Sequence, residues 1–240
     1  IPKRLRNPLL EEKITTPFLA KYADALMLDE RSNVFSTEAF QKGLFEVQDA
    51  ASQCVAPFTQ AESGMRVIDA CAGAGGKSLH LAALMQNKGQ LIALDIHQYK
   101  LRELKRRAKR AGAHNIETRL IDSTKVIKKL HQTADRVLLD APCSGLGVLR
   151  RNPDAKWKLS QEFIERILKE QQQILTQYAH MVKPGGKLIY VTCSILPQEN
   201  EAQIAQFLQS EIGKAFSLEK EKHFWPKLPR RLQVNLKFKS

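Results

Sequence analysis

The fold class follows from a glycine-rich stretch, Asp69-Ala70-Cys71-Ala72-Gly73-Ala74-Gly75-Gly76-Lys77-Ser78. An apolar run at residues 66–70 leads into it and predicts a strand, and a segment of helical period at residues 77–86 follows it. Glycines at such a junction let the chain turn sharply and let a ligand approach the backbone. The stretch therefore predicts a ligand-binding loop between the first strand and the first helix of an α/β sheet.

Short apolar runs alternate with longer segments of helical period outward from this loop. The alternation is typical of βαβ units around a mostly parallel, doubly wound sheet of the Rossmann-like α/β class. Ser160 is the expected N-cap of the longest helix, Pro184-Gly185-Gly186 is expected to end it, and a helix at 49–56 is expected to end at Pro57. The expected strands are 66–70, 90–95, 116–121, 135–140 and 187–192, and the other expected helices are 77–86, 98–111 and 161–182.

Lysine and arginine outnumber aspartate and glutamate by 38 to 25, which gives a net charge of +13. This balance favours a polyanionic partner, nucleic acid first, although basic solvated faces also occur in proteins that bind none. The four cysteines form no Cys-x-x-Cys pair, so we expect reduced thiols in a cytoplasmic protein, with no metal and no membrane span. Ile1 rather than Met at the start leaves open a preceding domain, and the oligomeric state is not predicted.

Two nucleotide-binding motifs can be tested against the glycine loop by their spacing. A phosphate-binding P-loop needs glycine five residues before Gly76, where this chain has Cys71. The dinucleotide fingerprint needs glycine or alanine three residues after Gly75, where this chain has Ser78. The loop therefore matches neither motif in full.

Acidic residues at the ends of the next two strands indicate a nucleoside ligand. Asp95 lies twenty residues after Gly75, where a carboxylate can accept both hydroxyls of a ribose. Asp122 follows the third strand and is placed to reach an adenine. Taken singly, a glycine turn or an aspartate after a strand is common in α/β proteins of many functions. In this order they are similar to the cofactor site of Rossmann-like S-adenosylmethionine-dependent methyltransferases.

Two cysteines follow the last two expected strands. Cys143 lies in Asp140-Ala141-Pro142-Cys143-Ser144-Gly145, and Cys193 lies in Thr192-Cys193-Ser194. The carboxyl ends of adjacent strands converge on one crevice, so both thiols are expected to face the same substrate. For a lone buried cysteine the ordinary interpretation is a small apolar core residue, which we keep for Cys54.

The chain resembles the Fmu/Sun family of bacterial RNA 5-methylcytosine methyltransferases, related to the eukaryotic Nop2/Sun group. The motifs that carry the resemblance span residues from about 40 to about 210. They are Val47-Gln48-Asp49-Ala50-Ala51-Ser52, Gly75-Gly76-Lys77, Asp140-Ala141-Pro142-Cys143-Ser144-Gly145, Arg150-Arg151-Asn152-Pro153-Asp154 with Lys156-Trp157, and Thr192-Cys193-Ser194 followed by Pro197-Gln198-Glu199-Asn200.

The resemblance implies methyl transfer from S-adenosyl-L-methionine to carbon 5 of a cytosine. Carbon 5 is too electron-poor to react unaided, so a covalent nucleophile must activate it. By resemblance Cys193 is that nucleophile, Cys143 assists its release, and Asp140 and Lys77 touch the cytosine or the thiol. Lys77 is also a source of positive charge that would lower the pKa of the thiol. The residues implied to bind the cofactor are Cys71, Ala72, Gly73, Ala74, Gly75, Gly76, Lys77, Asp95, Asp122 and Asp140.

A basic segment with one aromatic residue follows the Cys143 loop and is the expected RNA interface. The alternative is a solvated loop with Trp157 packed into the core. We interpret the basic helix at 98–111 as solvated. A paired base would have to be extruded, so an unpaired or loop cytosine is favoured, with ribosomal RNA as the preferred class. The expected RNA-binding residues are Arg150, Arg151, Lys156 and Trp157, beside Lys158.

Residues 1–45 are expected to form an N-terminal arm or the remnant of a small RNA-binding subdomain, and residues 46–240 the catalytic domain. The family commonly ends in a Gly-Asp-Gly-Phe-Phe strand, which this chain lacks. The alternating Leu232, Val234, Leu236 and Phe238 could supply a final edge strand instead. Without the glycine turn, reduced activity or a partner-completed site stays open.

Three other activities remain open beside a ribosomal RNA methyltransferase. They are a transfer RNA cytosine methyltransferase, a DNA cytosine methyltransferase that uses Cys143, and a catalytically weak RNA-binding assembly factor with the same fold.

Overall fold

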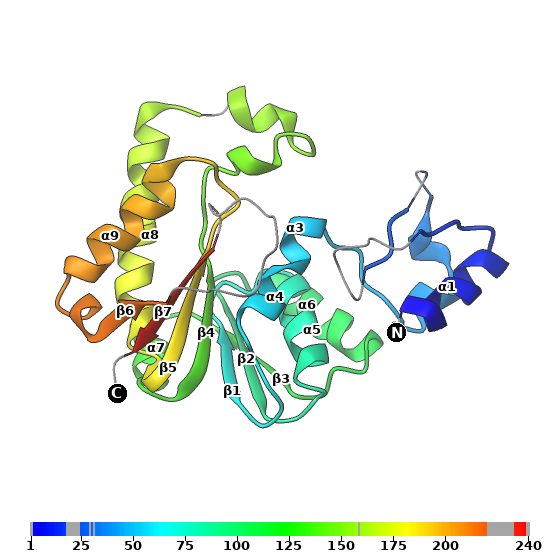
Figure 1. Ribbon diagram of the computed structural model, residues 1–240, viewed down its shortest axis with the longest axis horizontal. Coiled ribbons are helices and arrows are strands. Elements are labelled where there is room, and N and C mark those ends of the chain that lie inside the picture. Colours follow the sequence, from blue (N-terminus) through cyan, green and yellow to red (C-terminus); the bar gives the residue numbers. More distant parts are fainter. Residues whose placement is uncertain are drawn as a thin grey trace.

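Seven strands of the described residues form one sheet in the order β3-β2-β1-β4-β5-β7-β6 (Figure 1). The computed structural model describes residues 2–17, 25–28, 30, 32–157, 159–219 and 233–238. The first five strands pair in parallel, and β7 pairs antiparallel with both β5 and β6. The strands are β1 (Arg66–Asp69), β2 (Gln90–Asp95), β3 (Ile116–Leu120), β4 (Ala134–Asp140), β5 (Val182–Val191), β6 (Phe216–Leu218) and β7 (Gln233–Phe238).

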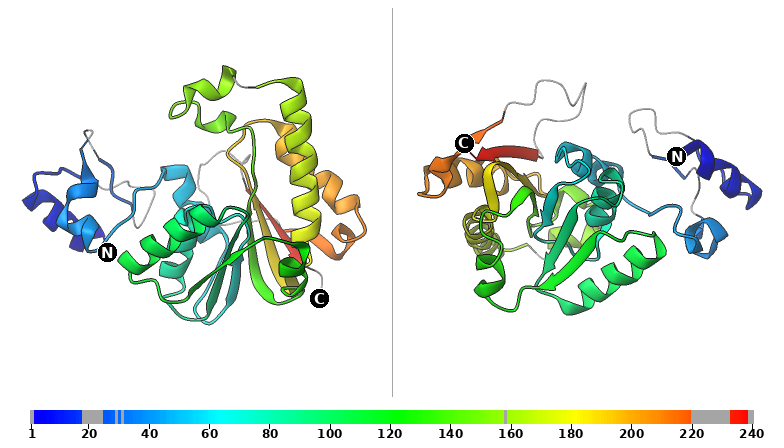
Figure 2. Two further views of the ribbon diagram at one scale, coloured as in Figure 1. Left: turned by 180° about the vertical axis from the view of Figure 1, so that it is seen from behind. Right: turned by 90° about the horizontal axis from the view of Figure 1, so that it is seen from below.

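Helices cover both faces of the sheet (Figures 1 and 2). Adjacent strand residues such as Val67 and Ile68 pack on opposite faces, as the pleat of a strand requires. On one face lie α4, α5 and α6, and on the other lie α7, α8 and α9. The helices are α1 (Pro2–Glu11), α2 (Glu38–Gln41), α3 (Ala50–Gln53), α4 (Val55–Phe58), α5 (Gly76–Leu84), α6 (Gln98–Arg110), α7 (Thr124–Lys128), α8 (Gln161–Ala179) and α9 (Glu201–Gln209).

This arrangement places a crevice where the strand order reverses. The chain goes from β1 to β2 on one side and returns to β4 on the other side of β1. The loops that follow β1 and β4 therefore part at their carboxyl ends, which is where open α/β sheets bind ligands. The predicted doubly wound, mostly parallel sheet is confirmed.

Several predicted boundaries are wrong. The longest helix ends at Ala179 rather than at residue 182, because Val182 pairs with Ala134. The strand predicted at 187–192 therefore begins earlier, at Val182, as β5. Pro184-Gly185-Gly186 lies in a bulge of β5, with Gly185 at φ 77°, instead of ending the helix. The predicted helix at 49–56 is two short helices, α3 and α4. Pro57 lies in the first turn of α4, where its missing N–H removes no hydrogen bond.

The C-terminal segment does form a strand, but not at the edge. β7 lies between β5 and β6, so the edge belongs to β6. Phe238 packs against Phe216 of β6 with 5.0 Å between ring centroids. Leu232 lies outside the described residues.

The N-terminal residues have a small buried cluster of their own, beside the sheet (Figure 1). Leu9, Ile14, Val34 and Ala39 form it. Downstream of this cluster, Glu46 pairs with Arg107 and Arg110 of α6. Among the described residues, no helix is both long and apolar enough to cross a membrane.

Candidate active site

The glycine loop needs two residues that tolerate a left-handed backbone. Gly75 has φ 89°, and a Cβ built on it would lie 2.5 Å from Cγ of Leu104 on α6. Gly73 has φ 56°, and a Cβ built on it would meet nothing within 4 Å. Gly75 is therefore required for packing as well as for the turn, whereas Gly73 faces open space.

Asp95 at the end of β2 holds this loop in place. Its Oδ2 accepts the backbone N–H of Gly73 at 2.9 Å, and its Oδ1 accepts the backbone N–H of His97 at 2.8 Å. A carboxylate has about four acceptor positions, so about two remain for a ligand. Asp122 is exposed and accepts a hydrogen bond from Ser123 at 3.1 Å.

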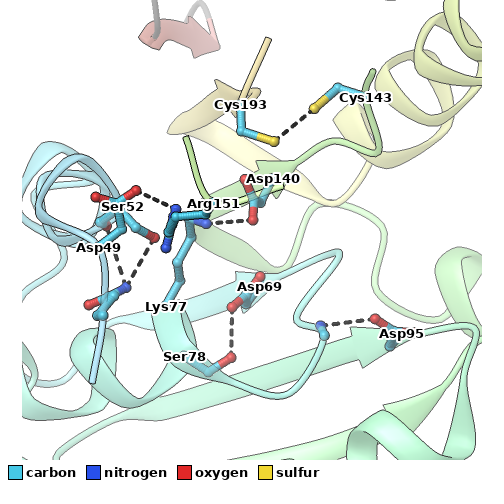
Figure 3. Close-up of polar contacts among 12 residues, drawn as sticks. Asp49, Ser52, Asp69, Lys77, Ser78, Asp95, Asp140, Cys143, Arg151 and Cys193 are labelled. Atoms are coloured by element: carbon cyan, nitrogen blue, oxygen red, sulfur yellow. Dashed lines mark hydrogen bonds and ion pairs between the residues drawn. The ribbon is translucent and has the colours of Figure 1, made fainter. Parts of the chain in front are cut away.

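Asp69 and Ser78 join the two ends of the loop beneath its surface. Ser78 Oγ donates to Asp69 Oδ2 at 2.6 Å, and both residues are buried (Figure 3). Burial raises the pKa of Asp69 to about 6. Burial also raises the pKa of the Cys71 thiol, with Asp69 adding to the effect, so Cys71 is not a thiolate at neutral pH. Sequence reasoning gave Asp69 no role, although Asp69 begins the decisive stretch.

Lys77 and Asp140 form an ion pair at the crevice. Lys77 lies in the first turn of α5 and donates from Nζ to Oδ2 of Asp140 at 2.6 Å (Figure 3). Asp140 is the last residue of β4, and both side chains are largely shielded from solvent, at 18% and 30% exposure. The pair thus places one cation and one carboxylate between the glycine loop and the two cysteines.

Cys143 and Cys193 point toward each other from the loops that follow β4 and β5 (Figure 3). Their Sγ atoms lie 3.2 Å apart, within hydrogen-bond range for sulfur. Cys193 is exposed, whereas Cys143 is half-buried. The two cysteines are fifty residues apart in the sequence, and the ends of β4 and β5 bring them together at one crevice, as expected.

The two thiols differ in acidity. The pKa of Cys193 is lowered to about 7, first by the hydrogen bond with Cys143 and further by the charge of Lys77, whereas burial and Asp140 oppose the shift. The pKa of Cys143 is raised, first by the same hydrogen bond and then by burial. Cys193 is therefore the thiol that becomes a thiolate near neutral pH, and Cys143 retains its proton.

The loops that carry the cysteines are joined by contacts that sequence reasoning missed. The backbone N–H of Gly147 donates to the carbonyl of Cys193 at 2.8 Å, and a Cβ on Gly147 would lie 2.7 Å from that oxygen. Ser144 and Ser194, which directly follow the two cysteines, both contact the buried Glu199. The sequence signal that could have predicted these contacts is the repeated dipeptide, Cys143-Ser144 and Cys193-Ser194.

The basic segment after the Cys143 loop is exposed. Trp157 is 79% exposed, so the alternative that packs it into the core is wrong. Lys156 lies over the ring of Trp157, with Nζ 4.7 Å from its centroid. Arg150 is exposed, and Arg151 forms an ion pair with Asp49 before α3 (Figure 3). Lys158 lies outside the described residues.

A family model described as 16S rRNA methyltransferase RsmB/F matches residues 57–224. The chain belongs to this family. The matched region contains the glycine loop, Asp140 and both cysteines. The resemblance to the Fmu/Sun family is confirmed, and this RsmB/F family is one of S-adenosylmethionine-dependent rRNA methyltransferases.

Bacterial relatives of the RsmB/F family cover most of the chain. A probable ribosomal RNA small subunit methyltransferase B of Synechocystis sp. is 39% identical over 203 residues, 84% of this chain and 46% of the relative. The protein of the same description from Bacillus subtilis is 39% identical over 193 residues, 79% of this chain and 43% of the relative. The chain therefore spans less than half the length of these curated relatives.

Solved structures confirm the Rossmann-like methyltransferase fold. A methyltransferase homolog protein from Pyrococcus horikoshii has a TM-score of 0.82 and 25% identity, covering 99% of this chain and 83% of that one. NSun6 from Pyrococcus horikoshii, solved with SFG, has a TM-score of 0.75 and 26% identity, covering 90% of this chain and 59% of that one. Within the described part of the chain, no three potential metal ligands gather.

Proposed function

We propose that this protein transfers a methyl group from S-adenosylmethionine to carbon 5 of an RNA cytosine, through a covalent bond between Cys193 and the base. The observation that carries the proposal is the thiol pair, with Sγ atoms 3.2 Å apart beside the Lys77–Asp140 ion pair. Attack on an electron-poor pyrimidine needs an activated nucleophile, and Cys193 has a lowered pKa.

The residues around the glycine loop fit a bound S-adenosylmethionine. The space in front of Gly73 is open, and Asp95 keeps acceptor positions for a ribose diol. When bound, the cofactor supplies an electrophilic methyl group. The residues proposed to hold it are Cys71, Ala72, Gly73, Ala74, Gly75, Gly76, Lys77, Asp95, Asp122 and Asp140.

The proposed chemistry uses each thiol once. The Cys193 thiolate adds to carbon 6 of the cytosine, which makes carbon 5 an enamine-like nucleophile that accepts the methyl group. Solvent water takes the proton from carbon 5, the electrons of that C–H bond restore the double bond between carbons 5 and 6, and Cys193 leaves as a thiolate. Cys143 keeps its thiol proton within reach of Cys193 and assists this release. Asp140 and Lys77 orient the base beside the thiols.

RNA is the proposed substrate because of charge and of one exposed aromatic side chain. The net charge of +13 favours a phosphate backbone, and Trp157 offers a face on which an unpaired base can stack. Lys156 lies over its ring, and Arg150 is an exposed cation of the same segment. The names of the relatives point to small-subunit ribosomal RNA, and a cytoplasmic location is part of the proposal. We further propose residues 1–45 as an N-terminal arm or the remnant of a small RNA-binding subdomain, and residues 46–240 as the catalytic domain.

Label transfer tests this function. The protein is incubated with methyl-labelled S-adenosylmethionine and one nucleic acid at a time. The three substrates are unmethylated small-subunit ribosomal RNA, transfer RNA and DNA. We expect label in the ribosomal RNA as 5-methylcytosine, and none with Cys193→Ala. Cys54→Ala, which changes a buried cysteine outside the crevice, is the matched control and should retain activity. Label in transfer RNA or DNA alone would reassign the substrate, and no label in any of them would refute the proposal.

A further inference from the structure

Glu199 is a fully buried carboxylate that forms no ion pair with the described residues. It is the last residue of the short 3-10 helix Pro197–Glu199. Its Oε2 accepts the backbone N–H of Ser144 at 2.8 Å and Nε2 of Gln171 at 2.9 Å. Its Oε1 accepts the hydroxyls of Ser144 and Ser194. Four donors thus meet the two oxygens of this side chain, which acts only as an acceptor in these contacts.

The two serines connect this carboxylate to both thiols. Ser144 directly follows Cys143, and Ser194 directly follows Cys193. Because both hydroxyls donate to the same oxygen, the loop after β4 and the loop after β5 meet at one point. Each cysteine is therefore followed in the sequence by a serine whose hydroxyl is held by Glu199.

The anchor itself is held by the core. Tyr190 of β5 donates from its hydroxyl to the backbone carbonyl of Glu199 at 2.8 Å. Gln171 of α8, which is also fully buried, donates from the same Nε2 to the carbonyl of Pro142 at 2.8 Å. Glu199 is thus held between β5 and α8. Its hydrogen bonds to the two serines fix the cysteine loops to these two elements.

We propose that Glu199 is a positioning residue of the thiol pair, which holds Cys143 and Cys193 in contact through Ser144 and Ser194 without touching the substrate. The consequence for methyl transfer rests on the proposed function. The consequence for the thiols does not, because their reactivity can be measured without RNA.

Loosening the anchor should make Cys193 less acidic. The contact with Cys143 is the largest cause of the lowered pKa of Cys193, and the other charged groups acting on that thiol are Asp140 and Lys77. In Glu199→Gln an amide NH₂ replaces one carboxylate oxygen, so it faces donors instead of accepting from them. The cysteine loops then separate, and the pKa of Cys193 returns toward its ordinary value of about 8.5.

The experiment follows alkylation of Cys193 by iodoacetamide against pH in the free full chain, with the modified peptide quantified by mass spectrometry. Wild type should show a midpoint near 7. Glu199→Gln should shift it upward by about one unit, and Ser194→Ala should shift it in the same direction. Gln203→Met is the matched control. Gln203 is buried on α9, and its side chain donates to the carbonyl of Leu168 rather than to either cysteine loop.

The outcomes separate positioning from general destabilisation. The proposal is overturned if folded Glu199→Gln keeps the wild-type midpoint, or if Gln203→Met shifts it equally. If Glu199→Gln does not fold, Ser194→Ala and Ser144→Ala decide, and unchanged midpoints in both overturn it. With RNA, Glu199→Gln should lower kcat about tenfold with little change in the KM for RNA. Absence of methyl transfer in wild type would refute the proposed function while the alkylation result still stands or falls alone.

Discussion

The reactivity of Cys193 depends on three neighbouring side chains. The thiol of Cys143 stabilises the thiolate by a hydrogen bond, Lys77 stabilises it by charge, and Asp140 opposes both. Because Lys77 pairs with Asp140 at 2.6 Å, it acts twice, attracting the thiolate and offsetting the carboxylate. The charge of Lys77 is therefore a second, separable source of the acidity of Cys193.

Lys77→Met should move the pH dependence of Cys193 upward. A thiolate is present above its pKa, so alkylation of wild type should increase through pH 7 and level off above it. Without Lys77, Asp140 is left unpaired, and the midpoint should rise by about one unit. Lys42→Met removes an exposed cation that is not among the charges named as acting on Cys193, and it should change nothing. Equal midpoints for Lys77→Met and wild type would contradict this role of Lys77.

At the scale of elements, the glycine loop couples the first strand to two helices. Gly75 is the N-cap of α5 and also faces Leu104 of α6, so one residue serves a turn and a helix contact. Gly185, in the bulge of β5, has a similar φ of 77°, but a Cβ built there would meet nothing within 4 Å. Substitution of Gly185 therefore tests the cost of the left-handed backbone alone, whereas substitution of Gly75 adds the steric clash with Leu104.

Gly75→Ala should destabilise the protein more than Gly185→Ala. A left-handed backbone costs alanine about 1 kcal/mol at both positions. At position 75 the clash with Leu104 should add about 1–3 kcal/mol. Urea unfolding of the two variants measures the difference, and Gly75→Ala should also weaken cofactor binding. Equal losses of unfolding free energy would show that the contact with Leu104 contributes nothing.

Elements with a strong local pattern could be predicted, and those decided by distant contacts could not. The strand at 90–95 is a buried apolar run, and its bounds match β2. The end of α8 depends on pairing between Val182 and Ala134, which no local pattern carries. The three residues of β6 are too few to show a period. In the site, the cysteines were placed by strand ends, whereas the role of Glu199 depends on contacts across fifty-five residues.

At the scale of the whole molecule, positive charge is distributed over more than one surface. The segment with Arg150 and Lys156 follows the Cys143 loop, whereas Arg102 and Lys105 are exposed on α6. All four are exposed, so charge alone does not say which surface RNA contacts. The salt dependence of binding distinguishes them, because each phosphate neutralised adds to its slope.

Neutralising the two surfaces should have different effects. The Arg150→Gln and Lys156→Gln double variant should bind single-stranded RNA more weakly and lower the salt slope by about 0.7 per lost phosphate contact. The Arg102→Gln and Lys105→Gln double variant removes the same charge from α6 and should leave the slope unchanged. Binding titrations at several salt concentrations measure both. Equal slopes for the two variants would place RNA elsewhere than expected.

Trapping the covalent adduct shows whether Cys193 attacks the base and Cys143 assists its release, or whether the two thiols have the opposite roles. Cys143→Ala is incubated with S-adenosylmethionine and small-subunit ribosomal RNA, then analysed by denaturing gel electrophoresis and peptide mapping. We predict an RNA–protein adduct that survives denaturation, maps to Cys193, and is absent from the Cys143→Ala and Cys193→Ala double variant. An adduct that instead forms in Cys193→Ala and maps to Cys143 would contradict the account.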